Sequence, residues 1–237
     1  MRRRSRQGAS AIEFSFSLLV LVPLLLGAAG IGISMLRQLQ TVQLARDAGA
    51  MFARKVDFTL LGSQQILSRV AGSLGLTVTT GSGGSSNTAG VAGAGNAVVI
   101  LSAIQYVNAG VCAQATPPLL ANTGSCHNFG SWVFAKRLVV GNNTLRTSNL
   151  GTPTGLTTAI DSTGTITIND QCLTATDKVT GTNPWTNPWN GSPTYPVDPN
   201  SLTVIQVQPI YVSEAAAVGF RMPPFSSGTT VYAQLYF

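Results

Sequence analysis

The chain has little of what most enzymes use at an active site. Of its 237 residues, only 9% are charged and one is histidine, whereas an ordinary soluble domain carries about 25% charged residues. There is no CxxC pair and no GxSxG, HExxH or phosphate-binding loop motif. His127, Cys126 and Cys112 would offer at most three loosely spaced soft ligands. We therefore expect no catalytic residues, no metal and no cofactor.

Basic charge is concentrated at the N-terminus. The net charge is +6, but Arg2, Arg3, Arg4 and Arg6 supply four of the fourteen basic residues, and without them the excess is +2. No basic stripe with interleaved aromatic residues follows. The glycine-rich stretch at 81–96 lacks the Lys-Ser/Thr ending of a phosphate-binding loop. We expect no nucleic acid and no small-molecule substrate.

A long uncharged run follows the arginines. Residues 14–36 are 23 residues without a charge, and as a helix they would extend about 34 Å, enough to cross a hydrocarbon core of about 30 Å. The preceding arginines place the N-terminus in the cytoplasm and the remainder outside. Pro23 should kink this helix, and Gly27 and Gly30 give small faces for close approach of another helix.

Glu13 is out of place at the start of this run. A carboxylate that enters a bilayer costs about 2.5–3.5 kcal/mol at a helix centre, so its presence suggests a function. Two other interpretations of the segment remain open. Residues 18–26 could be the apolar region of a secretory signal peptide with a small-residue site at 27–29, or the run could be a plain anchor in which Glu13 is incidental.

The N-terminus resembles that of type IV pilin-like precursors. RRRSRQGASAIEFSFSLLVLVPLLL, residues 2–26, combines a basic leader, Gly8, Glu13 at a fixed spacing and an apolar helix. It is most similar to the TadE-like proteins of tight-adherence (Flp-type) pilus systems. The similarity continues through LRQLQTVQLARDAGAMFARKV at 36–56 and covers about the first quarter of the chain. Phe14, where the small major Flp pilins have tyrosine, and the greater length favour a minor pilin or pseudopilin.

The resemblance implies a processing site and an assembly role. A prepilin peptidase would cut between Gly8 and Ala9, which makes Glu13 the fifth mature residue and Phe14 the aromatic residue after it. Glu13 would then pair with the N-terminal ammonium of a neighbouring subunit. Partners would be the peptidase, other pilus subunits, the inner-membrane assembly platform and the membrane itself.

The pattern of the remaining chain predicts an α+β fold. We expect a leader at 1–8, a transmembrane helix at 9–36, an amphipathic helix at 37–76 and a β-rich domain at 77–237. The amphipathic helix, which Gly62 could interrupt, has an apolar stripe at intervals of three and four residues, namely Leu36, Leu39, Val42, Ala45, Ala48, Phe52, Val56 and Leu60. Strands are expected at 96–107, 131–141, 163–170, 201–212 and 229–237.

Loops and cysteines complete the expectations. Residues 81–96 should form a flexible loop, and 183–200, with five prolines, cannot be a central strand. Trp185 and Trp189 on that loop either hold it to its own domain or recognise a glycan or partner. Of the three possible cysteine pairings, we predict Cys112–Cys126, because these two are nearest in sequence and flank a loop with Pro117, Pro118 and Gly124.

The sequence thus indicates a non-enzymatic, single-pass protein of a bacterial inner membrane, with its C-terminal domain in the periplasm or carried on a surface pilus. It would contribute to pilus initiation, assembly or surface attachment. The alternatives are a secreted binding or adhesin domain exported by an ordinary signal peptide, and an envelope enzyme on a membrane anchor.

Overall fold

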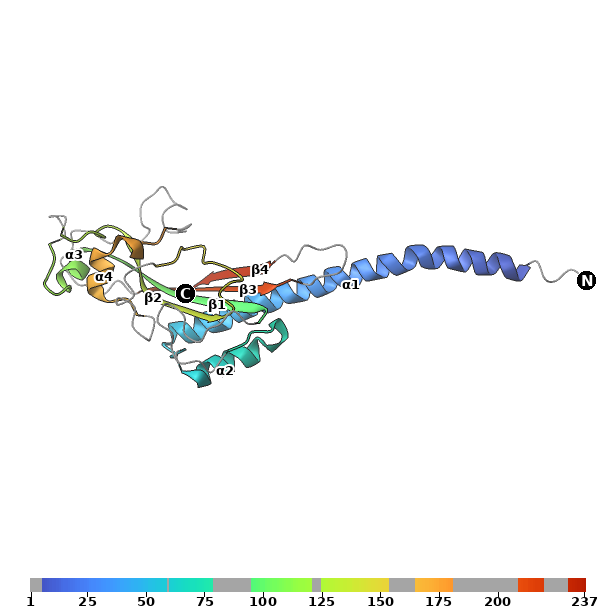
Figure 1. The fold of residues 1–237 in the computed structure, drawn as a ribbon, viewed down its shortest axis with the longest axis horizontal. Coiled ribbons are helices and arrows are strands. Elements are labelled where there is room, and N and C mark those ends of the chain that lie inside the picture. The colour runs from blue at the N-terminus through green and yellow to red at the C-terminus, as the bar shows by residue number, and fades with distance from the viewer. Residues whose placement is uncertain are drawn as a thin grey trace, which may run out of the picture.

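One long helix dominates the architecture. The computed structural model describes residues 6–58, 60–78, 95–120, 125–153, 165–180, 209–219 and 230–237. Helix α1, Arg6–Ala53, has 48 residues and extends about 72 Å at 1.5 Å per residue. Its N-terminal half projects from the folded domain, and its C-terminal half lies along the sheet (Figure 1).

The domain is built on a four-stranded antiparallel sheet in the order β2-β1-β3-β4. The strands are β1 (Ala97–Tyr106), β2 (Trp132–Gly141), β3 (Ile210–Val218) and β4 (Thr230–Tyr236). A bulge between Ala103 and Ile104 shifts the β1–β2 register. The expected α+β class, with a long N-terminal helix followed by strands, is therefore confirmed.

Short helices surround the sheet. Helix α2 (Leu61–Val70) and the 3-10 turn η1 (Gly72–Leu74) follow α1, and α2 lies beside α1 in Figure 1. Helices α3 (Ala109–Ala113) and α4 (Ile168–Leu173), with the 3-10 turn η3 (Ala175–Asp177), form the end of the molecule farthest from the N-terminus. Asn108 caps α3 by accepting from the Val111 amide, and Thr167 caps α4 by accepting from the Asp170 amide.

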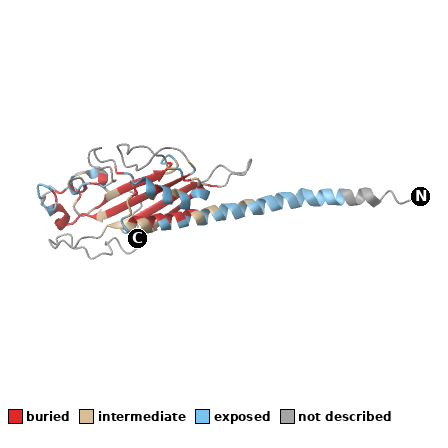
Figure 2. Ribbon diagram, turned by 90° about the horizontal axis from the view of Figure 1, so that it is seen from below, coloured by how far each residue is buried: buried red, intermediate tan, exposed pale blue. Residues whose placement is uncertain are grey.

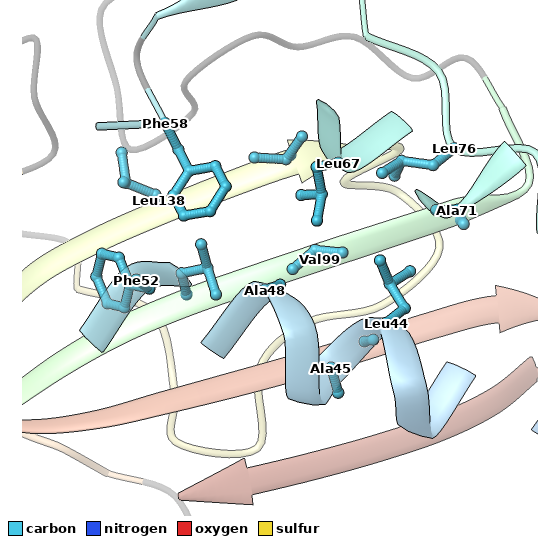
Figure 3. Packing of buried hydrophobic residues seen from close by; sticks show 14 of the residues in the cluster. Leu44, Ala45, Ala48, Phe52, Phe58, Leu67, Ala71, Leu76, Val99 and Leu138 are labelled. Carbon is cyan, nitrogen blue, oxygen red and sulfur yellow. The ribbon is translucent and has the colours of Figure 1, made fainter. Parts of the chain in front are cut away.

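The main core lies between α1, α2 and one face of the sheet. Small residues of α1, Ala45 and Ala48, meet small residues of β3 and β4, which lets the helix approach the sheet closely. Leu44, Phe52 and Leu67 fill the space around them (Figure 3). At Gly49 an added Cβ would lie 2.1 Å from the Phe237 ring, so the C-terminal residue also packs directly on α1.

The buried face of α1 differs from the predicted stripe. Ala45, Ala48 and Phe52 are buried as expected, but Leu36, Leu39 and Val42 are exposed. The buried stripe begins instead at Thr41 and Leu44. The helix thus has two overlapping apolar stripes on different sides. Only the stripe that includes Leu44 packs on the sheet, and the one that includes Leu36 and Leu39 does not.

The second helical segment also begins elsewhere than predicted. Residues 37–76 do not form one helix interrupted at Gly62, because α1 ends at Ala53 and α2 begins at Leu61. Lys55 adopts a left-handed φ of 63°, which turns the chain out of α1. Gly62 then lies within α2, where a Cβ would meet nothing within 4 Å.

Three predicted strands are confirmed and one is wrong. β1, β2 and β4 coincide within one residue with the expected strands at 96–107, 131–141 and 229–237. In the stretch 163–170, residues 163 and 164 lie outside the described part, Thr165 and Ile166 form isolated bridges, and α4 begins at Ile168. β3 begins at Ile210 and continues to Val218, past the expected end at Val212, while residues 201–208 lie outside the described part.

Candidate functional site

The N-terminal half of α1 is exposed and apolar on all sides. Its exposed large side chains, from Ile12 to Leu36, are Ile12, Phe14, Phe16, Leu18, Leu19, Val20, Leu21, Val22, Leu24, Leu25, Leu26, Ile31, Ile33, Met35 and Leu36. Figure 2 shows this half exposed while the domain is largely buried. A helix that is apolar all round needs an apolar environment. By length and composition, α1 is the one helix among the described residues that could cross a membrane.

Glu13 lies at the start of this apolar segment, next to Phe14, and both side chains are exposed. The first residue of α1 that bonds to the sheet is Arg37, about 36 Å farther along the helix axis. No side chain of the described sheet domain can therefore reach the Glu13 carboxylate. Among the described residues, the sheet domain therefore offers the Glu13 carboxylate no partner.

The other predicted residues of this segment lie along the same helix. Gly8 and Ala9 belong to the first turns of α1, and residues 1–5 lie outside the described part. The helix continues through Pro23 without interruption. A Cβ added at Gly27 or at Gly32 would meet nothing within 4 Å, and Gly30 is partly exposed. These glycines leave patches of bare backbone that another helix could approach.

The sheet domain begins where the uncharged run ends. Arg37 is the first charged residue after the run, and its Nη1 donates to the Val218 carbonyl oxygen at 2.7 Å. Thr41, one turn later, is fully buried and donates to the Arg37 carbonyl. The apolar segment and the domain are thus joined by continuous helix and not by a linker. Arg37 was not predicted from the sequence as a contact to the sheet. Its position directly after the uncharged run was the signal that could have shown where the domain begins.

A buried polar cluster occupies the sheet face opposite α1. Glu214 of β3 is 1% exposed. Its carboxylate accepts hydrogen bonds from the Ser148 hydroxyl, the Asn149 amide and the Tyr232 hydroxyl. These bonds fix the segment after β2 to the centre of the sheet. A carboxylate with three donors is well satisfied despite its burial.

Arg137 extends this cluster to the other edge of the sheet. Its guanidinium is 2% exposed and donates to the Ser102 hydroxyl at 2.6 Å and to the Gly151 carbonyl at 3.3 Å. Ser102 and Arg137 are cross-strand partners of β1 and β2, as Glu214 and Gln234 are of β3 and β4. Each of the four strands therefore places a polar side chain on this face, and the pairing of the strands brings these side chains together.

Burial shifts the pKa of two members of the cluster. Burial raises the pKa of the Tyr232 hydroxyl, and its hydrogen bond to Glu214 raises it further. Burial lowers the pKa of Arg137 to about 10, against the opposing effect of Glu214. At neutral pH Tyr232 therefore stays neutral and Arg137 stays protonated. The cluster is a stable structural element at the pH where the protein would function.

The cysteines converge at the end of the domain formed by α3 and α4. Cys112 and Cys126 are joined by a disulfide bond, the pair expected from the sequence, and Cys172 is a buried free thiol. All three sulfur atoms lie within 4.8 Å of one another. His127 is exposed and does not belong to this group. Trp185 and Trp189 lie outside the described residues, as do 79–94 and the rest of 183–200.

No protein-family model, curated protein or solved structure matches this chain.

Proposed function

We propose that this chain is a non-enzymatic, pilin-like envelope protein, a minor pilin or pseudopilin of the TadE-like kind. The observation that supports this most directly is the position of Glu13. It stands at the start of an exposed helix that is apolar on all sides, and the described sheet domain is too far along the helix to reach it. A carboxylate retained in such a place is best explained by a charged partner on a neighbouring subunit.

The architecture suits a subunit that first sits in a membrane and then packs beside other helices. The exposed half of α1 would lie in the inner membrane, with the arginine-rich start in the cytoplasm and the sheet domain in the periplasm. During assembly the same apolar surface would pack against the helices of other subunits. Because α1 continues from the apolar segment into the core, the position of one helix would determine the orientation of its domain.

Cleavage between Gly8 and Ala9 would create the partner charge. In the structure both residues are helical, so a peptidase that binds an extended chain must unwind the first turns. Glycine favours this, because it destabilises a helix by about 1 kcal/mol relative to alanine. The new ammonium at Ala9 of one subunit could then pair with Glu13 of the next. Desolvation offsets much of the Coulomb gain, so the pair would specify helix register more than stability.

Two substitutions test the processing site and the assembly residue separately. Gly8→Val should block cleavage and leave a full-length precursor in the membrane, whereas Gly27→Val, the same change within the helix, should leave processing intact. The readout is the mass of the membrane-bound chain. Processing of the Gly8→Val chain at Ala9 would contradict the proposed cleavage site.

Glu13→Ala should be cleaved normally but should co-purify poorly with other pilus subunits. Breaking a fully buried pair leaves a charge unpaired at a cost of about 3–5 kcal/mol. Ser17→Ala, which removes a polar group one turn farther along the exposed helix, serves as the control and should assemble like the parent. Normal assembly of Glu13→Ala would leave the plain membrane anchor as the better explanation.

A further inference from the structure

The three cysteines are held together by separate, well-anchored segments. Cys112 lies in α3, Cys126 in the segment before β2, and Cys172 in α4, at the end of the molecule farthest from the N-terminus (Figure 1). Cys112 and Cys172 are fully buried and Cys126 nearly so. Their sulfur atoms lie within 4.8 Å of one another, although only Cys112 and Cys126 are bonded.

Hydrogen bonds hold α4 against both segments that carry the disulfide. Asn128, two residues after Cys126, donates its backbone amide to the Cys172 carbonyl at 3.0 Å and its side-chain amide to the Gln171 carbonyl at 2.8 Å. On the other side, Asn169 and Thr116 exchange two hydrogen bonds, each 2.8 Å long. The position of the third sulfur is therefore fixed by α4 and does not depend on a loose loop.

The Cys172 thiol lies against the chain beside Cys112. Its sulfur is 3.8 Å from the carbonyl oxygen of Val111, the residue immediately before Cys112. Val111 is held in turn, because its amide donates to the Asn108 side chain at 2.9 Å. Cys112 is thus held in place beside Cys172.

We propose that Cys172 is an exchange thiol that can replace Cys126 as the disulfide partner of Cys112. The Cys172 sulfur attacks the Cys112 sulfur as its thiol gives up the proton that Cys126 takes up on leaving. A Cys112–Cys172 bond forms as the Cys112–Cys126 bond breaks, and Cys126 leaves as a thiolate that takes up a proton. One disulfide and one thiol are present before and after, so the step needs no oxidant or reductant.

The exchange moves the free thiol from α4 to the segment before β2. Cys172 is 0% exposed in an apolar cluster with Val111, Val133 and other buried residues. Cys126 is 3% exposed in the same cluster, but its neighbours Ser125 and His127 both have exposed side chains. Once released, the Cys126 thiol would be within reach of an external thiol reagent. The folded chain would thus present a reactive thiol at the end of its domain only after exchange.

Burial makes the starting pairing persistent. It raises the pKa of the Cys172 thiol to about 11, and because the thiolate is the attacking species, exchange is slow at neutral pH. The folded chain therefore keeps the Cys112–Cys126 disulfide, and Cys172 stays a free thiol until exchange occurs.

Peptide mapping of the full-length protein in detergent tests this directly. The folded protein is incubated with N-ethylmaleimide, quenched with acid and digested without reduction. Exchange predicts label on Cys126 together with a growing Cys112–Cys172 linked peptide, and no label at all in Cys172→Ala. Label on Cys172 alone, with Cys112–Cys126 retained, would overturn the proposal.

A second variant tests the alternative bond without relying on the rate. Cys126→Ala, expressed in an oxidising compartment, should form the Cys112–Cys172 disulfide in most molecules. It should also unfold at a higher urea concentration than Cys126→Ala combined with Cys172→Ala, which has no disulfide. Two free thiols in folded Cys126→Ala, or equal urea midpoints for the two variants, would mean that Cys172 cannot bond to Cys112.

Discussion

Removal of the Glu214 carboxylate should strongly destabilise the sheet domain. Glu214→Ala leaves the Ser148 and Tyr232 hydroxyls without their acceptor and leaves Arg137 buried without the opposing charge. Breaking such a buried charged network costs about 3–5 kcal/mol. Tyr232→Phe removes one donor but keeps the ring beneath Arg146, whose guanidinium carbon lies 3.8 Å from the ring centre, and should cost about 1–3 kcal/mol.

Urea unfolding followed by fluorescence of the buried Trp132 measures both losses. A Glu214→Ala variant that unfolds at the same urea concentration as the parent would show that the cluster does not stabilise the sheet.

Tyr232 should also make the domain lose stability at alkaline pH. Its pKa is raised in the folded state, whereas in the unfolded chain it is about 10. Above pH 10 the unfolded state loses a proton that the folded state keeps, so the free energy of unfolding falls as pH rises, by up to about 1.4 kcal/mol per pH unit.

Tyr232→Phe removes this contribution, and its free energy of unfolding should fall less between pH 9 and pH 11 than that of the parent. Arg137, whose pKa is lowered, and Cys172, whose pKa is raised, are present in both proteins. The difference between the two pH profiles therefore reports Tyr232. Parallel profiles would show that the pKa of Tyr232 is not raised in the folded domain.

Single residues were the hardest features to predict from the sequence. Glu13 was singled out because it interrupts an otherwise uncharged segment, and its role stays a prediction. Cys112–Cys126 was predicted because these two cysteines are nearest in sequence, and the structure has this disulfide. Glu214 and Arg137 were missed, because each is one ordinary charge within a strand. Only the pairing of Ser102 with Arg137 and of Glu214 with Gln234 brings these strands into register on one buried face.

At the scale of elements, the docking of α1 on the sheet depends on where its buried stripe begins. Leu44 is buried against the sheet, and Leu39, five residues earlier on the same helix, is 62% exposed. Leu44→Ala should lower the free energy of unfolding of the domain by about 2–5 kcal/mol. Leu39→Ala should change it by no more than about 0.5 kcal/mol.

The comparison uses the same chemical change in the same helix, with urea midpoints in detergent as the readout. Equal losses from the two substitutions would show that the buried stripe extends back to Leu39, as the sequence pattern alone predicted.

The sequence predicts the strands best where β-branched and aromatic residues dominate. β1 and β2 contain VVI and WVF runs, and both lie where expected. β3 ends in SEAAAV, whose alanines favour helix by intrinsic propensity. It is a strand because Ala215 and Ala217 leave room for α1 to pack closely on the sheet. The prediction of a strand at 163–170 fails because Thr167 caps α4, so a helix follows and the alternating pattern ends there.

At the scale of the whole molecule, the structure combines an exposed apolar helix with a folded domain at its far end. By length and composition that helix could cross a membrane, and the arginines before it favour a cytoplasmic N-terminus. A reporter that is active only in the periplasm, fused after Phe237, should therefore be active. The matched fusion of a reporter active only in the cytoplasm should be inactive, and activity there would contradict the proposed orientation.

The pilin-like proposal depends above all on where the mature chain begins. Mass spectrometry of the intact protein, purified from a host that has the prepilin peptidase, determines this directly. We predict a chain that starts at Ala9 and retains the whole apolar segment of α1. A chain that starts near Gly30 would contradict the proposal in favour of a secreted protein, and an uncut chain that starts at Met1 would contradict it in favour of a plain membrane anchor.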